Sequence, residues 1–161
     1  MCDEEGGAGM DLCADCDAAL PRLRSACGRC AVPLPVDGLC GLCLRRPSPL
    51  RQVHAACLYE APVDRLLVRF KFHEDLAAGR LLAQLMSEAF ASLPRPDVLV
   101  PVPLHIRRLR SRGYDQALEL ARPLGRALDL PLRTRWLARR RATAPQSERN
   151  ALARRRNVRK A

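Results

Sequence analysis

The chain lacks long hydrophobic runs, a recognisable export signal and all but a few aromatic side chains. No apolar stretch in its 161 residues approaches the roughly 20 residues that a membrane-spanning helix needs, so the sequence predicts no membrane span. The first ten residues, MCDEEGGAGM, are acidic and contain no apolar core of a secretory signal. Because aromatic residues make up only 4% of the chain, we expect an aliphatic core.

Common catalytic and nucleotide-binding motifs are also missing. We find no P-loop, no G-x-G-x-x-G and no Ser-His-Asp grouping. The three histidines, His54, His73 and His105, are spread along the chain without metal-ligand spacing. No catalytic residue can therefore be assigned from residue types alone.

Positive charge is abundant and concentrated towards the C-terminal end. The formal net charge is +11, and residues 133–161 contain eleven Lys or Arg against Glu148 alone. Such a segment favours a polyanionic partner such as nucleic acid, or it forms a solvated basic face. Trp136 is its one aromatic residue, so stacking on bases is not indicated.

Cysteine is the most informative residue type. Residues 1–46 contain three C-x-x-C pairs, and two such turns supply the four thiolates of a tetrahedral zinc site. Eight cysteines without an export signal favour structural Zn²⁺ over disulfides or a redox pair. We therefore predict a zinc-ribbon module over residues 1–46. Its predicted ligands are the neighbouring Cys27, Cys30, Cys40 and Cys43; Cys13 and Cys16 are further candidates, which lack partners unless Cys2 helps.

Residues 47–161 are predicted to form an α/β domain with a parallel sheet and crossover helices. The apolar run at 98–102 is typical of a strand buried on both faces, and shorter strands are expected at 53–59 and 132–137. Helical spacing predicts one helix that opens at Ala61-Pro62, a second that ends at Pro94, and a third that starts near Ala117. Pro123 should kink or split the third helix.

An arginine-rich loop after the 98–102 run is the main candidate binding site. It reads IRRLRSRGYDQ over residues 106–116. Ligands in open α/β sheets bind beyond the carboxyl ends of strands, and guanidinium forks suit phosphate groups. A solvated basic loop is the alternative.

These motifs, in this order, resemble the competence protein F (ComF) family. The matching stretches follow the cysteine pairs and read LYEAPVDRLLVRFKFHEDL, DVLVPVPLHIRRLRSRGYDQALELA, RRRATAPQ and RRRNVRKA. The resemblance implies a zinc ribbon on a type I phosphoribosyltransferase-like domain, in a cytoplasmic bacterial protein linked to DNA uptake during natural transformation. It also implies a site for phosphoribosyl pyrophosphate with Mg²⁺, formed by Arg107, Arg108, Arg112, Gly113, Gln116, Thr143 and Gln146.

The chain departs from the family pattern at points that affect function. Asp115 stands where members usually have Asn, Arg149 replaces an apolar residue, and the first cysteine pair of a double zinc ribbon is missing. After residue 132 there is no pair of adjacent acids and no Thr- and Gly-rich turn to hold the ribose and its 5′-phosphate. We therefore expect a C-terminally truncated chain with an incomplete phosphoribosyl site.

Three functions agree with the sequence. The first is a ComF-like protein that binds single-stranded DNA and phosphoribosyl pyrophosphate and works with the DNA-uptake machinery. The second is a phosphoribosyltransferase of nucleotide salvage or synthesis, inactive in this form because the phosphoribosyl pyrophosphate loop is absent. The third is a zinc-ribbon interaction module. Salt-sensitive DNA binding would favour the first.

Overall fold

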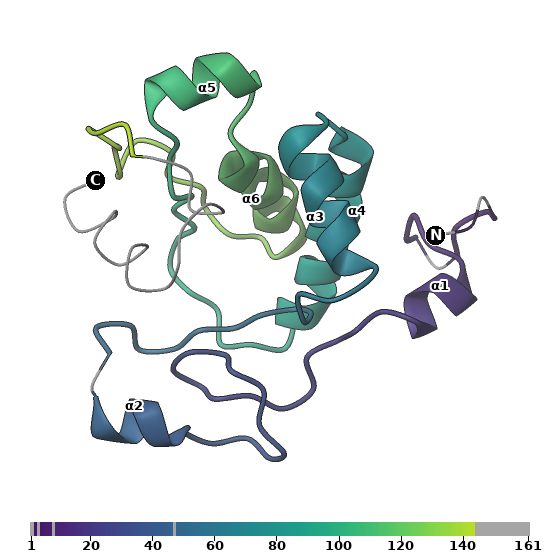
Figure 1. Ribbon diagram of the computed structural model, residues 1–161, viewed down its shortest axis with the longest axis vertical. Helices are drawn as coiled ribbons and strands as arrows, with labels where there is room; N and C mark the ends of the chain where they lie inside the picture. The colour runs from purple at the N-terminus through teal and green to yellow at the C-terminus, as the bar shows by residue number, and fades with distance from the viewer. Residues whose placement is uncertain (1, 3, 8, 47, 144–161) are drawn as a thin grey trace. The chain divides into compact units, whose positions relative to one another are not determined.

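The computed structural model describes residues 2, 4–7, 9–46 and 48–143. The chain divides into two compact units, Met1–Pro94 and Arg95–Ala161. Helices joined by loops make up the described residues of both units (Figure 1). The sequence predicted that residues 1–46 form a module of their own. The division into two units does not test whether that module folds independently, so this boundary stays a prediction.

The cysteine-rich part of unit 1 has little regular structure. Helices α1 (Ala14–Ala18) and α2 (Gly41–Arg45) have five residues each. An antiparallel bridge joins Arg22 to Cys57. The segment 53–59, predicted as a strand, therefore pairs at one residue only, which corrects that prediction. The bridge is closed by backbone hydrogen bonds from Leu23 N–H to the carbonyl of Ala56 and from Leu58 N–H to the carbonyl of Pro21, and the described residues extend the pairing no further.

Two helices form the core of unit 1. Helix α3 (Val63–Phe72) packs against helix α4 (Leu76–Phe90), as Figure 1 shows. Both helices were predicted from apolar residues at helical spacing, and both are confirmed. Helix α4 ends at Phe90, shortly before Pro94, where the sequence predicted its end; the residue that precedes a proline is disfavoured in the helical conformation. The buried side chains are Val63, Leu66 and Phe70 of α3 and Ala78, Leu81, Leu82, Ala83 and Leu85 of α4.

Ion pairs connect the cysteine-rich part to helix α4. Arg22 donates to Asp17 at 2.6 Å and to Glu88 at 3.1 Å. Asp11 accepts from Arg80 at 2.8 Å. These pairs are partly exposed, so each contributes at most about 1 kcal/mol. Within unit 1 they fix which face of α4 the cysteine-rich part covers.

The described residues of unit 2 form two helices and one backbone bridge. The helices are α5 (Ile106–Arg112) and α6 (Gln116–Ala127). A parallel bridge pairs Leu99 with Leu132, and the backbone N–H of Leu99 donates to the carbonyl of Pro131 at 2.9 Å. The arginine-rich segment follows an extended segment that is paired in the predicted parallel direction. This segment was predicted as a loop, which is wrong for residues 106–112, because they form helix α5.

The predicted buried sheet is not formed by the described residues. Positions 98–100 are half-buried, Val102 is 66% exposed, and 132–137 pairs only at residue 132. A strand is buried on both faces only when further strands lie beside it and helices cover it. An apolar run alone does not provide those neighbours, so the prediction of a doubly buried strand at 98–102 is wrong for this part of the chain.

Helix α6 continues through Pro123 without a break, so the predicted split is wrong. Proline removes one backbone donor and crowds the carbonyl four residues earlier. Ala121 and Leu124, 9% and 6% exposed, are buried on either side of it. Their burial offsets the lost hydrogen bond.

Candidate functional site

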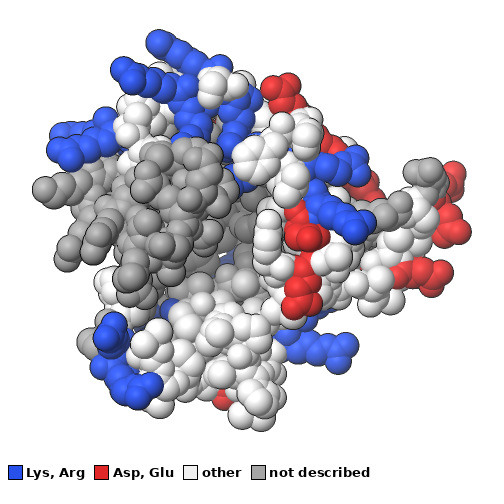
Figure 2. Space-filling model, in the orientation of Figure 1, with Lys and Arg blue, Asp and Glu red and all other residues white. Residues whose placement is uncertain are grey.

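A cavity of about 230 Å³ in unit 2 brings arginines from two segments together. Helix α5 supplies two of them, and Figure 2 shows Lys and Arg side chains gathered over α5. Among the residues that the structure describes, no Asp or Glu lines this cavity, so its potential is positive and suits an anion. The lining residues are Leu104, His105, Arg107, Arg108, Ser111, Arg139, Ala142 and Thr143.

Thr143 holds two of the guanidinium groups in place. Its backbone carbonyl accepts a hydrogen bond from Arg108 Nη2 at 2.8 Å, and its hydroxyl accepts one from Arg139 Nη2. A guanidinium has five N–H donors, so one bond from Arg108 leaves donors that can reach a ligand. The contacts to Thr143 thus orient the arginines without using up their capacity to bind an anion.

The residues that flank the arginines, His105 and Gly113, cap the two ends of α5. His105 precedes the helix as its N-cap, and its Nδ1 accepts the backbone N–H of Arg107 at 3.2 Å. Gly113 ends it with φ +82, a left-handed conformation that favours glycine. Gly113 therefore shapes this loop through its backbone.

Asp115 has a structural role that the sequence analysis missed. Its carboxylate caps α6 by accepting the N–H groups of Ala117 at 3.0 Å and Leu118 at 3.3 Å. It also accepts the N–H of Leu104 at 3.0 Å. Asp and Asn are about equally good caps, so the departure from the family pattern preserves the cap. The sequence did contain a signal for this role, because Asp115 stands directly before the residues that form α6, where an N-cap is expected.

The other predicted site residues are placed differently. Arg112 does not line the cavity, and burial lowers its pKa, with the charge of Arg108 adding to the effect. Gln116 is the first residue of α6, and its Nε2 is buried with no hydrogen-bond partner in the described part of the chain. Gln146 lies outside the described residues.

Of the predicted phosphate-binding set, the cavity therefore brings together Arg107, Arg108 and Thr143. Their role as ligands stays a prediction. Ser111 was missed as a lining residue. Its spacing of three from Arg108, which puts both on one helix face, was a usable signal.

The four cysteines predicted as zinc ligands lie together. The thiol sulfurs of Cys27, Cys30, Cys40 and Cys43 are all within 4.8 Å of one another. Cys30 Sγ and Cys40 Sγ are 3.8 Å apart, which equals the edge of about 3.8 Å expected for a tetrahedron with Zn–S bonds of about 2.3 Å. The arrangement fits structural Zn²⁺, which would tie the two turns together. The described residues contain no comparable group of carboxylates that could hold Mg²⁺.

Local hydrogen bonds and burial set the acidity of these thiols. The backbone N–H of Cys40 donates to Cys27 Sγ at 3.3 Å and lowers the pKa of Cys27 to about 6, although burial opposes this. Burial raises the pKa of Cys43 to about 12. Zinc binding needs thiolates, so metal uptake at Cys43 releases a proton.

The remaining cysteines lie outside this quartet. The thiols of Cys13 and Cys16 lie beside that of Cys2. This agrees with the alternative in which Cys2 is their partner. Cys57 is half-buried and belongs to neither group of described metal-ligating residues. Burial raises the pKa of Cys57.

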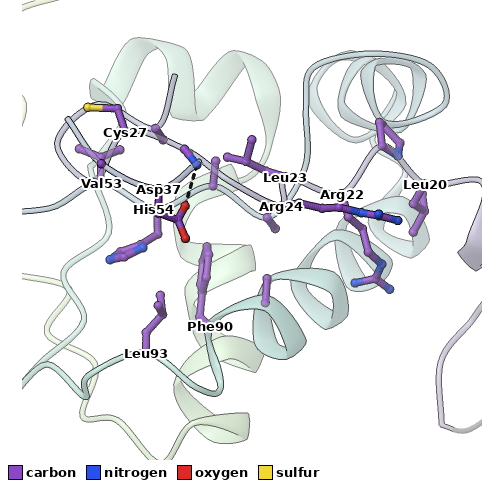
Figure 3. A pocket seen from close by; sticks show the side chains of 18 of the residues that line it. Leu20, Arg22, Leu23, Arg24, Cys27, Asp37, Val53, His54, Phe90 and Leu93 are labelled. Atoms are coloured by element: carbon purple, nitrogen blue, oxygen red, sulfur yellow. Dashed lines mark hydrogen bonds between the residues drawn. The ribbon is translucent and has the colours of Figure 1, made fainter. Parts of the chain in front are cut away.

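A larger hollow of about 1140 Å³ lies in unit 1. Phe90 and Leu93 lie on one side of it and Leu23 and Val53 on the other (Figure 3). The carboxylate of Asp37, which also lines it, already accepts the N–H of Ala26 at 3.0 Å. Its lining includes Arg22 and Arg24, but Asp17 and Asp37 line it as well, and Arg22 is paired with Asp17 and Glu88. We therefore assign the candidate site to the smaller, arginine-lined cavity, whose described lining contains no acid.

Comparison with known proteins identifies relatives along most of the chain. The DNA utilization protein YhgH of Salmonella typhi is 35% identical over 157 residues, covering 93% of this chain and 69% of the relative. Competence protein F of Haemophilus influenzae is 31% identical, with 93% and 68% covered. Competence protein ComFC of Bacillus subtilis is 31% identical over 131 residues, with 75% and 54% covered.

Other comparisons find no counterpart. No family model matches the chain, and no solved structure matches it. Among the described residues, no helix combines the length and apolar character needed to cross a bilayer.

Proposed function

The chain belongs to the competence protein F (ComF) family, and from this premise we propose that it binds single-stranded DNA in DNA uptake and utilisation. The relatives carry names that refer to competence and DNA utilisation. The observation that carries the proposal is the arginine-lined cavity at α5, which has no acid among its described lining residues. DNA-uptake proteins in the cytoplasm are the expected partners.

The chemistry of the cavity fits phosphate groups and not particular bases. Arg107, Arg108 and Arg139 present charged N–H donors, and hydrogen bonds between guanidinium and phosphate are among the stronger polar contacts in proteins. The described lining contains no Phe, Tyr or Trp on which bases could stack. We therefore expect binding that depends on salt and little on sequence.

Phosphoribosyl pyrophosphate with Mg²⁺, which the family resemblance implies, is the second ligand that we propose for this location, because its phosphate groups suit the same arginines. The parallel bridge at Leu99 places the arginine-rich loop after an extended segment, where ligands bind in α/β proteins. We propose on this ground that residues 95–161 form part of a phosphoribosyltransferase-like domain. Arg112, Gly113, Gln116 and Gln146 remain proposed members of the site.

Transfer of a phosphoribosyl group is the alternative activity, and its catalytic residues are unknown. A role as a zinc-ribbon interaction module is the third possibility. The geometry favours neither over DNA binding, because the described cavity holds donors for an anion but no paired acids for a ribose.

Fluorescence anisotropy with labelled single-stranded DNA of mixed sequence tests the proposal. We expect binding at low salt, and about tenfold weaker binding for Arg108→Ala, equivalent to about 1.4 kcal/mol. Arg126→Ala is the matched control, since it removes an equal charge from the exposed side of α6. Equal losses in both variants, or no binding at low salt, would refute a specific role for the cavity.

Isothermal titration with phosphoribosyl pyrophosphate and Mg²⁺ separates the two ligands. Micromolar binding that Arg108→Ala abolishes would place the sugar phosphate in this cavity. Competition between phosphoribosyl pyrophosphate and DNA would then show that they share it. Undetectable heat in a protein that still binds DNA would rule out the sugar phosphate as a ligand of this chain.

A further inference from the structure

Thr143 lies at the wall of the arginine-lined cavity with its hydroxyl against a guanidinium group. The hydroxyl accepts a hydrogen bond from Arg139 Nη2, and the backbone carbonyl of Thr143 accepts one from Arg108 Nη2 at 2.8 Å. Arg107 lines the same cavity. A phosphoryl group attached to this hydroxyl would therefore enter a space that three arginines line.

The cavity has room for such a group. Its volume of about 230 Å³ is several times the roughly 30 Å³ that one water molecule occupies in the liquid. Its described lining contains no Asp or Glu that would repel a phosphate. The hydroxyl of Thr143 thus stands where an added dianion would be held.

The sequence before Thr143 is strongly basic. Arg139, Arg140 and Arg141 precede it, with Ala142 between. Protein kinases select their substrates partly by charge pattern, and arginines two and three residues before a hydroxyl suit a kinase with an acidic substrate groove. The other threonine of the chain, Thr134, follows Pro131, Leu132 and Arg133 and lacks this pattern.

The local structure favours access to Thr143. Residues 134–143 form no helix or strand, and among the described residues no backbone-to-backbone hydrogen bond holds this segment to another. A segment with so few contacts opens readily. Ser111, which also lines the cavity, lies inside helix α5, so a kinase would have to unwind that helix to reach it.

We propose that Thr143 is a phosphorylation site whose phosphate occupies the arginine-lined cavity and blocks it. In the reaction, Thr143 Oγ1 attacks the γ-phosphorus of ATP on a protein kinase, the bond to the ADP oxygen breaks, and the hydroxyl proton passes to a base of the kinase. That the blocked ligand is single-stranded DNA rests on the proposed function of the cavity.

Electrostatics favours the attached phosphate over a phosphate of DNA. Phosphothreonine carries a charge of about −1.5 to −2 at pH 7 and three strong acceptor oxygens, whereas each phosphate of a DNA strand carries a single negative charge. The attached group also competes from within the protein, at an effective concentration on the order of millimolar. Phosphorylation of Thr143 should therefore displace DNA from Arg107 and Arg108.

Modification of the full chain by a serine/threonine kinase that selects arginine two and three residues before its target is the first test. With ATP, mass spectrometry should find phosphate on Thr143 and little on Thr134. Arg140→Gln combined with Arg141→Gln removes the selected arginines, neither of which lines the cavity, and should lower the incorporation at least tenfold. No phosphate on Thr143, or equal incorporation in the double variant, would overturn the proposal.

The effect on DNA is measured with phosphothreonine placed at position 143 by codon reassignment. Phosphothreonine at position 134 is the matched control, since it adds an equal charge to an exposed residue of the same segment. In fluorescence anisotropy we expect binding of single-stranded DNA to weaken at least tenfold in the first protein and less than threefold in the second. Equal weakening would show a general charge effect and overturn the blocking of the cavity.

Phosphorus-31 NMR detects occupation of the cavity without DNA. The guanidinium groups stabilise the dianion, so the second ionisation of the phosphate at position 143 should occur below the ordinary pKa of about 6, and Arg108→Ala should move it back towards that value. A lowered pKa in a protein that binds no DNA even when unmodified would refute the proposed function and still support the phosphate site. An ordinary pKa would overturn the phosphate site, whatever the result with DNA.

Discussion

Gly79 in helix α4 leaves room for a hydrogen atom and nothing larger. A Cβ at this position would collide with the ring of Phe70, which is 2% exposed. Glycine in a helix interior normally costs about 1 kcal/mol relative to alanine. Here the close approach of α3 and α4 reverses that preference.

Gly79→Ala should therefore lower the free energy of unfolding by about 1–3 kcal/mol, the usual range for overpacking, despite the gain in helix propensity. Urea denaturation followed by circular dichroism measures it. In a double-mutant cycle, Phe70→Leu should relieve part of the loss. Stabilisation by Gly79→Ala alone would show that the two helices pack less closely.

Asp115 allows a second prediction at the scale of single residues. Its carboxylate accepts three backbone N–H groups, from Leu104, Ala117 and Leu118. Asp115→Ala should lower the free energy of unfolding by about 1 kcal/mol, as for other lost caps. Asp115→Asn retains a capping oxygen and should cost less. Equal losses in thermal denaturation would contradict the capping role.

At the scale of elements, the longer helices α3, α4 and α6 were predicted from the sequence, whereas the short helices α1, α2 and α5 were not, and the predicted strands pair only at single residues. The apolar spacing in α3 and α4 needs only one partner face, and each helix meets it in the other. The run at 98–102 needs partners on both edges and both faces to be a buried strand, and the described residues provide one bridge at Leu99. The local apolar pattern therefore identified the three longer helices, whereas a buried strand depends on pairing with distant segments, which the pattern does not contain.

Helix α4 carries a pH-dependent contribution at its start. Asp75 accepts the N–H of Ala78 at 2.9 Å and pairs with Arg69 at 2.6 Å. The hydrogen bond from Ala78 first, and the charge of Arg69 after it, hold the pKa of Asp75 below its ordinary value against the effect of burial. The ionised form is thus favoured in the folded state.

The contribution of Asp75 should be complete above its unfolded pKa of about 3.9 and decline as pH falls through the lower folded value. Asp75→Asn keeps the cap but cannot titrate, so the difference in stability between the two proteins should shrink below about pH 4. Urea midpoints measured at several pH values check this. A difference that stays constant with pH would show that the charge of Asp75 does not stabilise the helix.

At the scale of the whole molecule, the cysteine quartet was predictable in full, whereas the arginine site was predictable in part. Spacing in C-x-x-C turns fixes local geometry, so Cys27, Cys30, Cys40 and Cys43 could be named as one group. The cavity at α5 also depends on Thr143, thirty-five residues away from Arg108, and Thr143 could be named in advance only through the family resemblance. That contact arises from the path of the chain between them, which no local pattern encodes.

The cysteine-rich part should depend on metal for its stability. Few of its side chains are buried, while Val36 and Leu44 are 74% and 69% exposed. A core this small does not hold a fold without a metal or other cross-link. Chelation, or Cys40→Ser, should therefore raise hydrogen exchange in residues 26–44 and leave α3 and α4 protected. Unchanged exchange after zinc removal would contradict this.

The salt dependence of DNA binding tests the central claim most directly. For single-stranded DNA, each phosphate contact contributes about 0.7 to the slope of log K against log salt. Removing Arg107 and Arg108 together should therefore reduce that slope by about 1.4, while Arg126→Ala leaves it unchanged. If the double variant keeps the slope of the unchanged protein, the arginines at α5 do not contact phosphate, and the proposed function of the cavity is wrong.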